Sequence, residues 1–344
     1  MKRNKRRMMA EWEPQRGVQL TWPHKDTDWA PILPEITAVY EEMAREISKR
    51  EALLIVASEK FTSHLSPLTS YLLTFTSNDT WARDHGFITV EETSDLRPQT
   101  SDLILLDFKF NGWGEKFPAE RDNQINKQLF DKGLVKGVYE DHLDFVLEGG
   151  SIESDGKGTV FTTACCLLAP HRNQPLTAQQ IEDRLKEYLG AERIVWLHHG
   201  SLIGDDTDGH IDTLVRICPD DTLLYTGGDE DHPDLARMEE ELQALRTMEG
   251  KPYRLLKLPL PRPIYDTTAI SHQPSAINRL PATYANYLVI NGAVLVPTYN
   301  QPDLDQEAMH VIQQAFPDRE IVGIDCRAVI KQHGSLHCCT MQYY

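Results

Sequence analysis

The segment Ile152-Glu-Ser-Asp-Gly-Lys-Gly-Thr-Val-Phe-Thr162, with the 35 residues that follow it, contains the pattern that decides the fold. Its two apolar runs flank Asp155-Gly156, a dipeptide that favours a two-residue turn between antiparallel strands. A helix is predicted over 177–190, between a capping box at its start and a glycine at its end. A short apolar strand follows at 193–197. The segment therefore predicts a unit of hairpin, helix and strand.

The same pattern recurs along the rest of the chain, at intervals of roughly 55 to 70 residues. A second hairpin is predicted over 288–297, turning at Asn291-Gly292. Helices paired with a following strand are predicted at 34–49 with 52–57, 234–246 with 253–260, and 304–315 with 321–324. Such repetition indicates an α/β array of similar units about an axis. A doubly wound dinucleotide fold is not favoured, since the sequence has no G-x-G-x-x-G motif between a strand and a helix.

The charge balance limits the classes of partner. The chain of 344 residues has 35 Lys and Arg against 52 Asp and Glu, a formal charge of −17. This charge repels nucleic-acid phosphates and anionic lipid surfaces, and it attracts cations. We therefore expect neither a nucleic acid nor a membrane as a partner. Acidity that serves only solubility remains the alternative explanation.

The six cysteines include two adjacent pairs and no CxxC motif, which favours a reducing compartment and a cytoplasmic location. Residues 1–10 are basic, precede no apolar run and are expected to form a disordered tail. No apolar stretch is long enough to span a membrane. Residues 11–344 contain no Gly-, Ser- or Pro-rich linker, so they are expected to form one domain.

Four short segments place an ionisable group beside glycine or tryptophan: Trp81-Ala-Arg-Asp84, Leu147-Glu-Gly-Gly150, Asp205–Asp212 and Gly334-Ser-Leu-His-Cys338. Each also has a purely structural explanation. A carboxylate beside glycine is common in turns, and a cysteine near an apolar segment is usually a small hydrophobic residue. The segments therefore become candidates for a site only in combination.

The acidic run Asp205–Asp212 also suggests a metal site, but its spacing fits poorly. An EF-hand loop would need a carboxylate at Gly204 and a glutamate at Val215. His198, His199 and His210 lack the compact spacing of a zinc site. We therefore expect no metal and no other cofactor.

His210 and Asp212 lie two residues apart at the start of the apolar run 213–217. On a strand, this spacing would place a base and an anion on one face. If Cys338 lies opposite them, the imidazole can support a thiolate, and the carboxylates provide the negative surface that a planar guanidinium requires.

Taken together, these segments resemble those of the agmatine deiminases of the guanidine-modifying superfamily. The likeness extends from Glu11-Trp-Glu-Pro14 nearly to Gln342. It includes Leu20-Thr-Trp-Pro-His24, Asp107-Phe-Lys-Phe-Asn-Gly-Trp-Gly114, the segments 147–173 and 204–212, and Phe316-Pro-Asp-Arg-Glu-Ile-Val-Gly323. The resemblance implies the five-bladed, pseudo-fivefold α/β-propeller (pentein) fold, which would explain the recurring units. Its members are often dimeric, so a homodimer or higher homo-oligomer is expected.

The resemblance also implies roles for individual residues. Cys338 would be the nucleophile, His210 the general acid and base, and Glu148 the carboxylate that orients His210. Substrate-binding roles would fall to Asp84, Asp212, Trp81, Trp113 and Asp206. The two tryptophans would form aromatic walls around a cation, although core packing is a competing explanation for both.

The implied activity is hydrolysis of agmatine, a small cationic guanidine, to N-carbamoylputrescine and ammonia through a covalent cysteine intermediate. Deimination of peptidyl arginine or free arginine is an alternative within the same chemistry. A catalytically inactive propeller that binds polyamines or a protein is an alternative from another class. The sequence departs from the family at Gln332-His-Gly-Ser335 and in its last four residues.

Overall fold

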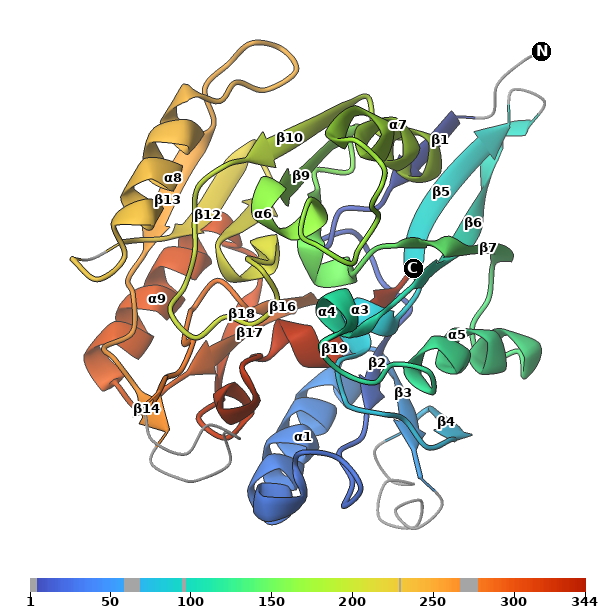
Figure 1. Ribbon diagram of the computed structural model, residues 1–344, viewed down its shortest axis with the longest axis horizontal. Coiled ribbons are helices and arrows are strands. Elements are labelled where there is room, and N and C mark those ends of the chain that lie inside the picture. The colour runs from blue at the N-terminus through green and yellow to red at the C-terminus, as the bar shows by residue number, and fades with distance from the viewer. Residues whose placement is uncertain (1–4, 59–68, 95–96, 229, 267–277) are drawn as a thin grey trace.

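The computed structural model describes residues 5–58, 69–94, 97–228, 230–266 and 278–344. Within them, five sheets of three or four strands are arranged about a centre, and a small two-stranded sheet lies apart from these five. Figure 1 shows the longer helices around the outside of this ring and the short helices α3 and α4 near its middle. The expected five-unit α/β-propeller is confirmed.

The segment that opens with Ile152 illustrates the repeated unit. Strand β8 (Ile152–Ser154) pairs antiparallel with β9 (Thr159–Thr163), which pairs parallel with β10 (Arg193–Leu197). Helix α7 (Ala178–Leu189) makes the crossover between the two parallel strands. The predicted capping box of Thr177 and Gln180 is present, and the helix ends at Gly190 in the left-handed conformation. The short helix α6 (Ala164–Leu167) precedes this crossover.

The other units repeat this order with local additions. One contains β11 (Val215–Cys218), β12 (Thr222–Thr226), α8 (Pro233–Ala244) and β13 (Arg254–Leu258), and another β16 (Leu288–Ile290), β17 (Ala293–Thr298), α9 (Pro302–Ala315) and β18 (Glu320–Asp325). A third contains β1 (Lys5–Met8), β5 (Ile88–Ser94), β6 (Arg97–Lys109), α4 (Gly112–Glu115), α5 (Asp122–Asp131) and β7 (Val138–Val146). The last contains β2 (Gly17–Thr21), α1 (Leu33–Ser48), β3 (Ala52–Ala57), β4 (Tyr71–Thr74) and β19 (Thr340–Tyr343), while β14 (Tyr265–Asp266) and β15 (Asn278–Arg279) form the small sheet.

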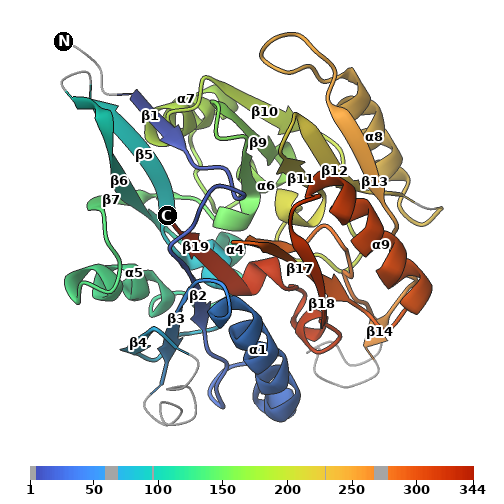
Figure 2. The same ribbon diagram turned by 180° about the vertical axis from the view of Figure 1, so that it is seen from behind.

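Both ends of the described chain are built into sheets. The C-terminal strand β19 pairs antiparallel with β2, so the first and last parts of the chain share one sheet (Figure 2). The N-terminal strand β1 pairs antiparallel with β5. The expectation of a disordered tail over residues 1–10 is therefore wrong from Lys5 onward. Arg6 and Arg7 form ion pairs with glutamates on neighbouring segments, and these pairs secure the basic strand. Residues 1–4 lie outside the described residues.

Most predicted elements are present within one or two residues of their expected bounds. The two-residue turn at Asn291-Gly292 is confirmed, because Ile290 pairs directly with Ala293. The turn at Asp155-Gly156 is longer than predicted, since the last paired residues are Ser154 and Val160. The Asp155 carboxylate accepts hydrogen bonds from the amides of Lys157 and Thr159, which stabilises the wider loop.

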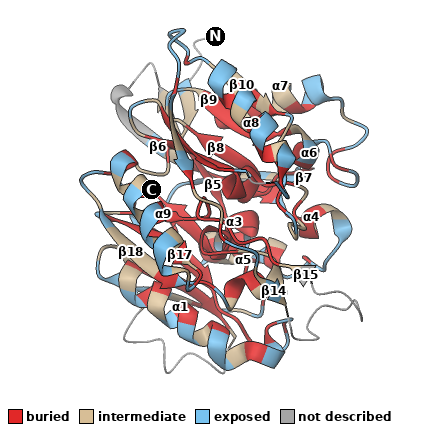
Figure 3. Ribbon diagram, turned by 90° about the vertical axis from the view of Figure 1, so that its left-hand side faces the viewer, coloured by how far each residue is buried: buried red, intermediate tan, exposed pale blue. Residues whose placement is uncertain are grey.

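The helices bury one face against the sheets and expose the other. In α1 the buried side chains recur at helical spacing: Ile36, Val39, Tyr40, Met43, Ala44 and Ile47. Figure 3 shows buried strands in the interior and exposed residues on the outer faces of α1, α8 and α9. Among the described residues, no helix has the length and apolar composition that crossing a membrane requires.

Candidate active site

A pocket of about 460 Å³ opens beside α3 (Ala82–His85) and the 3₁₀ helix η6 (His337–Cys339). It brings together residues from four of the segments identified in the sequence. The predicted residues among its lining are Trp81, Asp84, Trp113, Asp206 and Cys338. His210, Asp212 and Glu148 lie behind this lining and are fully buried.

Cys338 lies at the inner end of this pocket, with 5 % of its surface exposed. Its Sγ is 3.3 Å from Nδ2 and 3.4 Å from Oδ1 of Asn286, and 3.8 Å from Asp212 Oδ2. Cys338 and Cys339 are adjacent and both belong to the 3₁₀ helix η6. Cys339 nevertheless faces away, where its thiol donates to the Ser335 carbonyl at 3.3 Å.

The surroundings of Cys338 favour the neutral thiol in the absence of substrate. Burial raises the pKa of this thiol well above its ordinary value, and the charges of Asp212 and Asp84 raise it further. A cation bound between these carboxylates would offset their charge. Such a cation would therefore favour the thiolate at Cys338.

Asp84, His210 and Asp212 converge on Gly150. A methyl group at Gly150 would lie 2.6 Å from His210 Nδ1, 2.9 Å from Asp84 Oδ1 and 3.2 Å from Asp212 Oδ2. The residue must therefore lack a side chain. The Gly150 amide also donates to Asp84 Oδ1 at 3.0 Å, so the 3₁₀ helix η3 (Gly149–Ser151) helps to position that carboxylate.

His210 and Asp212 do not share a strand face as predicted. His210 precedes the 3₁₀ helix η4 (Ile211–Thr213), which contains Asp212, and strand β11 begins only after this turn. The turn still directs the side chains of His210 and Asp212 toward Gly150. The expectation of a base beside an anion thus holds, although its geometric basis was wrong.

The carboxylates of Asp212 and Asp84 differ in their hydrogen-bond partners and in the direction of their pKa shifts. Burial would raise the pKa of Asp212, but the hydrogen bond and charge of His337 outweigh burial and leave this pKa below its ordinary value. His337 Nδ1 is 2.7 Å from Asp212 Oδ2, whereas the buried Oδ1 has no hydrogen-bond partner. At Asp84, burial raises the pKa, and the indole of Trp113 donates to Oδ2 at 2.9 Å. Asp212 thus retains an unpaired oxygen for a guanidinium nitrogen.

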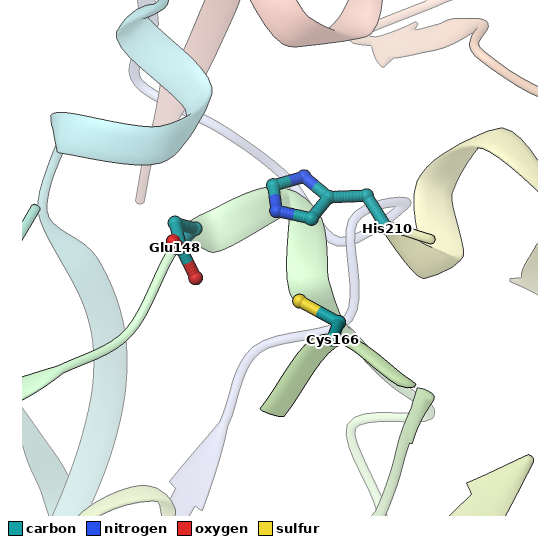
Figure 4. A group of neighbouring side chains, drawn as sticks. All are labelled: Glu148, Cys166 and His210. Carbon is teal, nitrogen blue, oxygen red and sulfur yellow. The ribbon is translucent and has the colours of Figure 1, made fainter. Parts of the chain in front are cut away.

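Glu148 faces His210, as Figure 4 shows, but it is bonded to another residue. Arg172 Nε donates to its two carboxylate oxygens at 3.1 and 3.2 Å, and both side chains are inaccessible to solvent. Donor atoms of Glu148 and His210 lie within 4.8 Å of each other. Both ring nitrogens of His210 are buried without a hydrogen-bond partner. Glu148, which was expected to orient His210, therefore lies near the imidazole without a hydrogen bond to it.

Aromatic side chains form much of the pocket wall. The rings of Trp81 and Trp113 are 6.2 Å apart and meet edge to face, and Phe117 packs on Trp113 with a centroid distance of 5.6 Å. Trp81 also packs closely over Gly334, where any side chain would collide with the indole. The segment 332–335, which departs from the family pattern, therefore has a glycine at the position where the Trp81 indole leaves no room for a side chain.

Asp206 lies further out, half-buried on the pocket wall. Burial raises the pKa of its carboxyl to about 6, an effect that the nearby His333 partly opposes. His333 also lines the pocket, and its Nδ1 lies 2.6 Å from the Gly204 carbonyl oxygen. A carboxylate at this position can accept a hydrogen bond from a cation that extends outward from Cys338.

The acidic run 205–212 does not form the metal site considered from its sequence. The Asp205 carboxylate accepts bonds from the Thr207 amide and hydroxyl and from the Gly209 amide, and so serves as the cap of a turn. His199 pairs instead with Asp234. Only His210 of the proposed ligands joins a cluster of potential metal-binding groups within the described part of the chain.

Three residues that contact the site were not identified from the sequence. Asn286 contacts the nucleophile, His337 holds Asp212, and Arg172 holds Glu148. His337 adjoins Cys338 and Arg172 lies within the segment 147–173, so both stood inside recognised motifs. Asn286 precedes a hairpin in an otherwise apolar stretch, and no spacing pattern connects it to the other site residues.

Comparison with known proteins places this geometry in a family. The family model of the Porphyromonas-type peptidyl-arginine deiminases matches residues 7–343. A curated agmatine deiminase of Pseudomonas aeruginosa is 32 % identical over 98 % of this chain and 95 % of its own length. These matches extend over the whole ring of units.

Solved structures agree with the sequence comparisons. A putative arginine deiminase from Porphyromonas gingivalis is 48 % identical, with a TM-score of 0.88 over 98 % of each chain. The C. jejuni agmatine deiminase with substrate bound is 35 % identical, with a TM-score of 0.88 over 99 % of this chain and 97 % of its own. The chain therefore belongs to the agmatine deiminase and Porphyromonas-type peptidyl-arginine deiminase family of guanidine-modifying hydrolases.

Proposed function

We propose that this protein hydrolyses agmatine to N-carbamoylputrescine and ammonia, with Cys338 as the covalent nucleophile. Asp84 and Asp212 hold the guanidinium group, and His210 moves protons. Glu148, fixed by Arg172, keeps a negative charge beside His210. Trp81 and Trp113 enclose the substrate, and Asp206 accepts a bond from its distal ammonium group.

The observation that carries this proposal is the charge of the pocket lining. It contains four carboxylates, Asp28, Asp79, Asp84 and Asp206, and neither lysine nor arginine among the described residues. Agmatine is cationic at both ends, whereas free arginine also has a carboxylate that needs a donor. Arg83 does not supply one, because it points to Gln342 and Met341 in a separate cavity behind the site.

The proposed reaction assigns one step to each of these groups. Guanidinium is resonance-stabilised and a poor electrophile, so a positioned sulfur is needed for attack. The Sγ–C bond forms as His210 relays the thiol proton to one guanidinium nitrogen, which leaves as ammonia. Water activated by His210 then attacks the thiouronium carbon and the C–S bond breaks. The products are a substituted urea and the regenerated thiol.

Deimination of free or peptidyl arginine is the second candidate, and the similarity to the P. gingivalis protein favours it. It uses the same inner site and differs only at the outer end of the pocket. An arginine carboxylate near Asp206 would lie beside like charge, and the nearby Lys116 ammonium is already bonded to Asp208 and to the Asp206 carbonyl. Placing a carboxylate there costs on the order of several kcal/mol. We therefore expect kcat/KM for agmatine to exceed that for arginine by about a thousandfold.

We further propose that residues 5–344 act as one deiminase domain in the cytoplasm, and that the enzyme forms a homodimer or higher homo-oligomer. The acidic chain and its free cysteines support the reducing compartment. Sedimentation at several concentrations would measure the oligomeric state.

The test of the proposed function is ammonia release by the purified protein from three substrates, namely agmatine, free arginine and a blocked arginyl peptide. The proposal expects agmatine to be preferred by about three orders of magnitude over free arginine. Comparable values for agmatine and arginine, or a higher value for the peptide, would reassign the substrate. Release from none of them would favour the inactive, polyamine-binding alternative.

A further inference from the structure

Cys166 lies beside the catalytic groups but has no role in the proposed reaction. It belongs to α6, is fully buried and is absent from the lining of the substrate pocket. Figure 4 shows its sulfur approaching the space between Glu148 and His210. One donor atom from each of these three residues lies within 4.8 Å of the other two.

The three donors have the chemistry of a soft-metal site. Thiolate, imidazole and carboxylate are the ligand types that bind Zn²⁺, at distances of about 2.0 to 2.3 Å. Ligand atoms around a tetrahedral zinc ion are then about 3.5 Å apart, so the three side chains need to move by only about an ångström. The imidazole is available, since both of its buried nitrogens lack a hydrogen-bond partner.

The surroundings can complete such a site. Arg172 donates to Glu148, and a carboxylate oxygen has two lone pairs, so the bond to Arg172 can persist while Glu148 binds a metal. Thr207 lines the substrate pocket, and its carbonyl accepts from Arg172 at 2.8 Å. Thr207 therefore separates the pocket from the Arg172 and Glu148 pair by a single residue's backbone contact. A water molecule from the pocket can serve as the fourth ligand.

We propose that Glu148, Cys166 and His210 form an inhibitory binding site for zinc or a similar soft divalent cation. Binding replaces the proton of the Cys166 thiol, which is released to solvent, by a sulfur–metal bond. The ion also occupies the lone pair with which His210 would accept a proton. Turnover stops although the Cys338 thiol and the substrate pocket remain intact. The inhibitory effect rests on the proposed function, whereas binding of the metal does not.

The second group of potential ligands, Glu11, Glu153 and His337, differs in a decisive way. Arg216 already lies within it, with its guanidinium 2.5 Å from each glutamate and 3.1 Å from His337 Nε2. A divalent cation there would have to displace a buried positive charge. The Cys166 group also contains a buried arginine, but Arg172 bonds only Glu148 among its three ligands. The His210 ring has no hydrogen-bond partner and only a longer contact of 3.7 Å, from Nδ1 to Asp84 Oδ1.

Binding is tested by titrating Co²⁺ into the Cys338→Ala protein and recording thiolate-to-cobalt charge-transfer absorption. Cys338→Ala removes the nucleophile as a competing ligand. We expect one equivalent to bind with the thiolate band, and the band to disappear when Cys166→Ser is added. The exposed neighbour provides the matched control, since Cys338→Ala with Cys165→Ser should keep the band. A band that survives Cys166→Ser, or no band in Cys338→Ala, overturns the assignment.

Inhibition is tested separately on active enzyme with agmatine as substrate. Enzyme stripped with EDTA should be fully active, and zinc should inhibit it. Cys166→Ser should weaken inhibition at least about tenfold, whereas Cys165→Ser should not. Cys166→Ala provides a second variant if serine disturbs the core. Equal inhibition of all variants, or loss of activity in EDTA that zinc restores, contradicts an inhibitory site at Cys166. The cobalt titration needs no turnover, so failure of the proposed function is distinguishable from failure of the metal site.

Discussion

Cys338 and Cys339 are adjacent in the chain but face different surroundings. The Cys338 sulfur lies at the inner end of the pocket, and the Cys339 thiol donates to a backbone carbonyl in the core. We expect Cys338→Ala to lower kcat for agmatine by at least about 10⁴-fold, because among the described residues no other thiol lines the pocket. Cys339→Ala should keep most activity. The measurement is steady-state ammonia release, with circular dichroism to show that both variants fold. Full activity of Cys338→Ala would refute the nucleophile assignment.

Asp206 is expected to set the pH dependence of agmatine binding. Burial raises its pKa to about 6, so the carboxylate is neutral below that pH and charged above it. Since only the charged form attracts the distal ammonium group, kcat/KM should rise with pH up to about 6 and then level off. Asp206→Asn should lower kcat/KM roughly 10- to 100-fold and remove this inflection.

Asp79 provides the control for Asp206. It also lines the pocket and burial also raises its pKa to about 6, but its Oδ1 already accepts bonds from the Trp29 indole and the Thr80 amide. Asp79→Asn should therefore retain the inflection. If Asp79→Asn removes the inflection and Asp206→Asn does not, the distal contact belongs to Asp79.

Individual site residues could be predicted from the sequence only where a motif marked them. Cys338, His210, Asp84 and Asp212 stood in motifs and are brought together by the fold. Asn286 was missed, because nothing in its neighbours relates it to a cysteine 52 positions away. Its contact depends on how two units of the ring meet, and a local pattern does not contain that information.

At the scale of elements, the short 3₁₀ helix η3 sets the spacing of the ionisable groups in the site. Gly150 lies against three ionisable groups, and a methyl group there would displace them. We expect Gly150→Ala to lower kcat about 100-fold, since misplacement by about 1 Å can cost that much. Gly133→Ala is the control for activity, because its φ of +65° strains the backbone on substitution but nothing lies within 4 Å of the added methyl group. An active Gly150→Ala enzyme would show that Asp84, His210 and Asp212 do not need this spacing.

The longer elements were predictable because each satisfies a local rule. Helix α7 has its capping box and terminal glycine, and the apolar spacing of α1 matches its buried face. The 3₁₀ turns η4 and η6 were not predicted, and both carry catalytic candidates. Each spans only three residues, too few for a period to appear, and its shape is determined by packing at the centre of the ring.

At the scale of the whole molecule, Arg216 connects parts of the chain that meet behind the site. Its guanidinium bonds Glu11 and Glu153 and the carbonyls of Ala285 and Tyr287. We expect Arg216→Met to lower the free energy of unfolding by about 3 to 5 kcal/mol, since it removes the positive charge that pairs with the Glu11 and Glu153 carboxylates. Urea denaturation would measure the change. Arg262→Met, at an exposed pair with Asp303, should match wild type. A similar loss in both variants would show that the buried cluster has no special role.

The central claim is that agmatine is converted through a covalent bond to Cys338. Its most direct test is mass spectrometry of protein quenched with acid during turnover of agmatine, followed by peptide mapping. The account predicts a peptide containing Cys338 heavier by the mass of agmatine less ammonia, and no such adduct in Cys338→Ala. An adduct on Cys339 or Cys166, or turnover by Cys338→Ala, would contradict it.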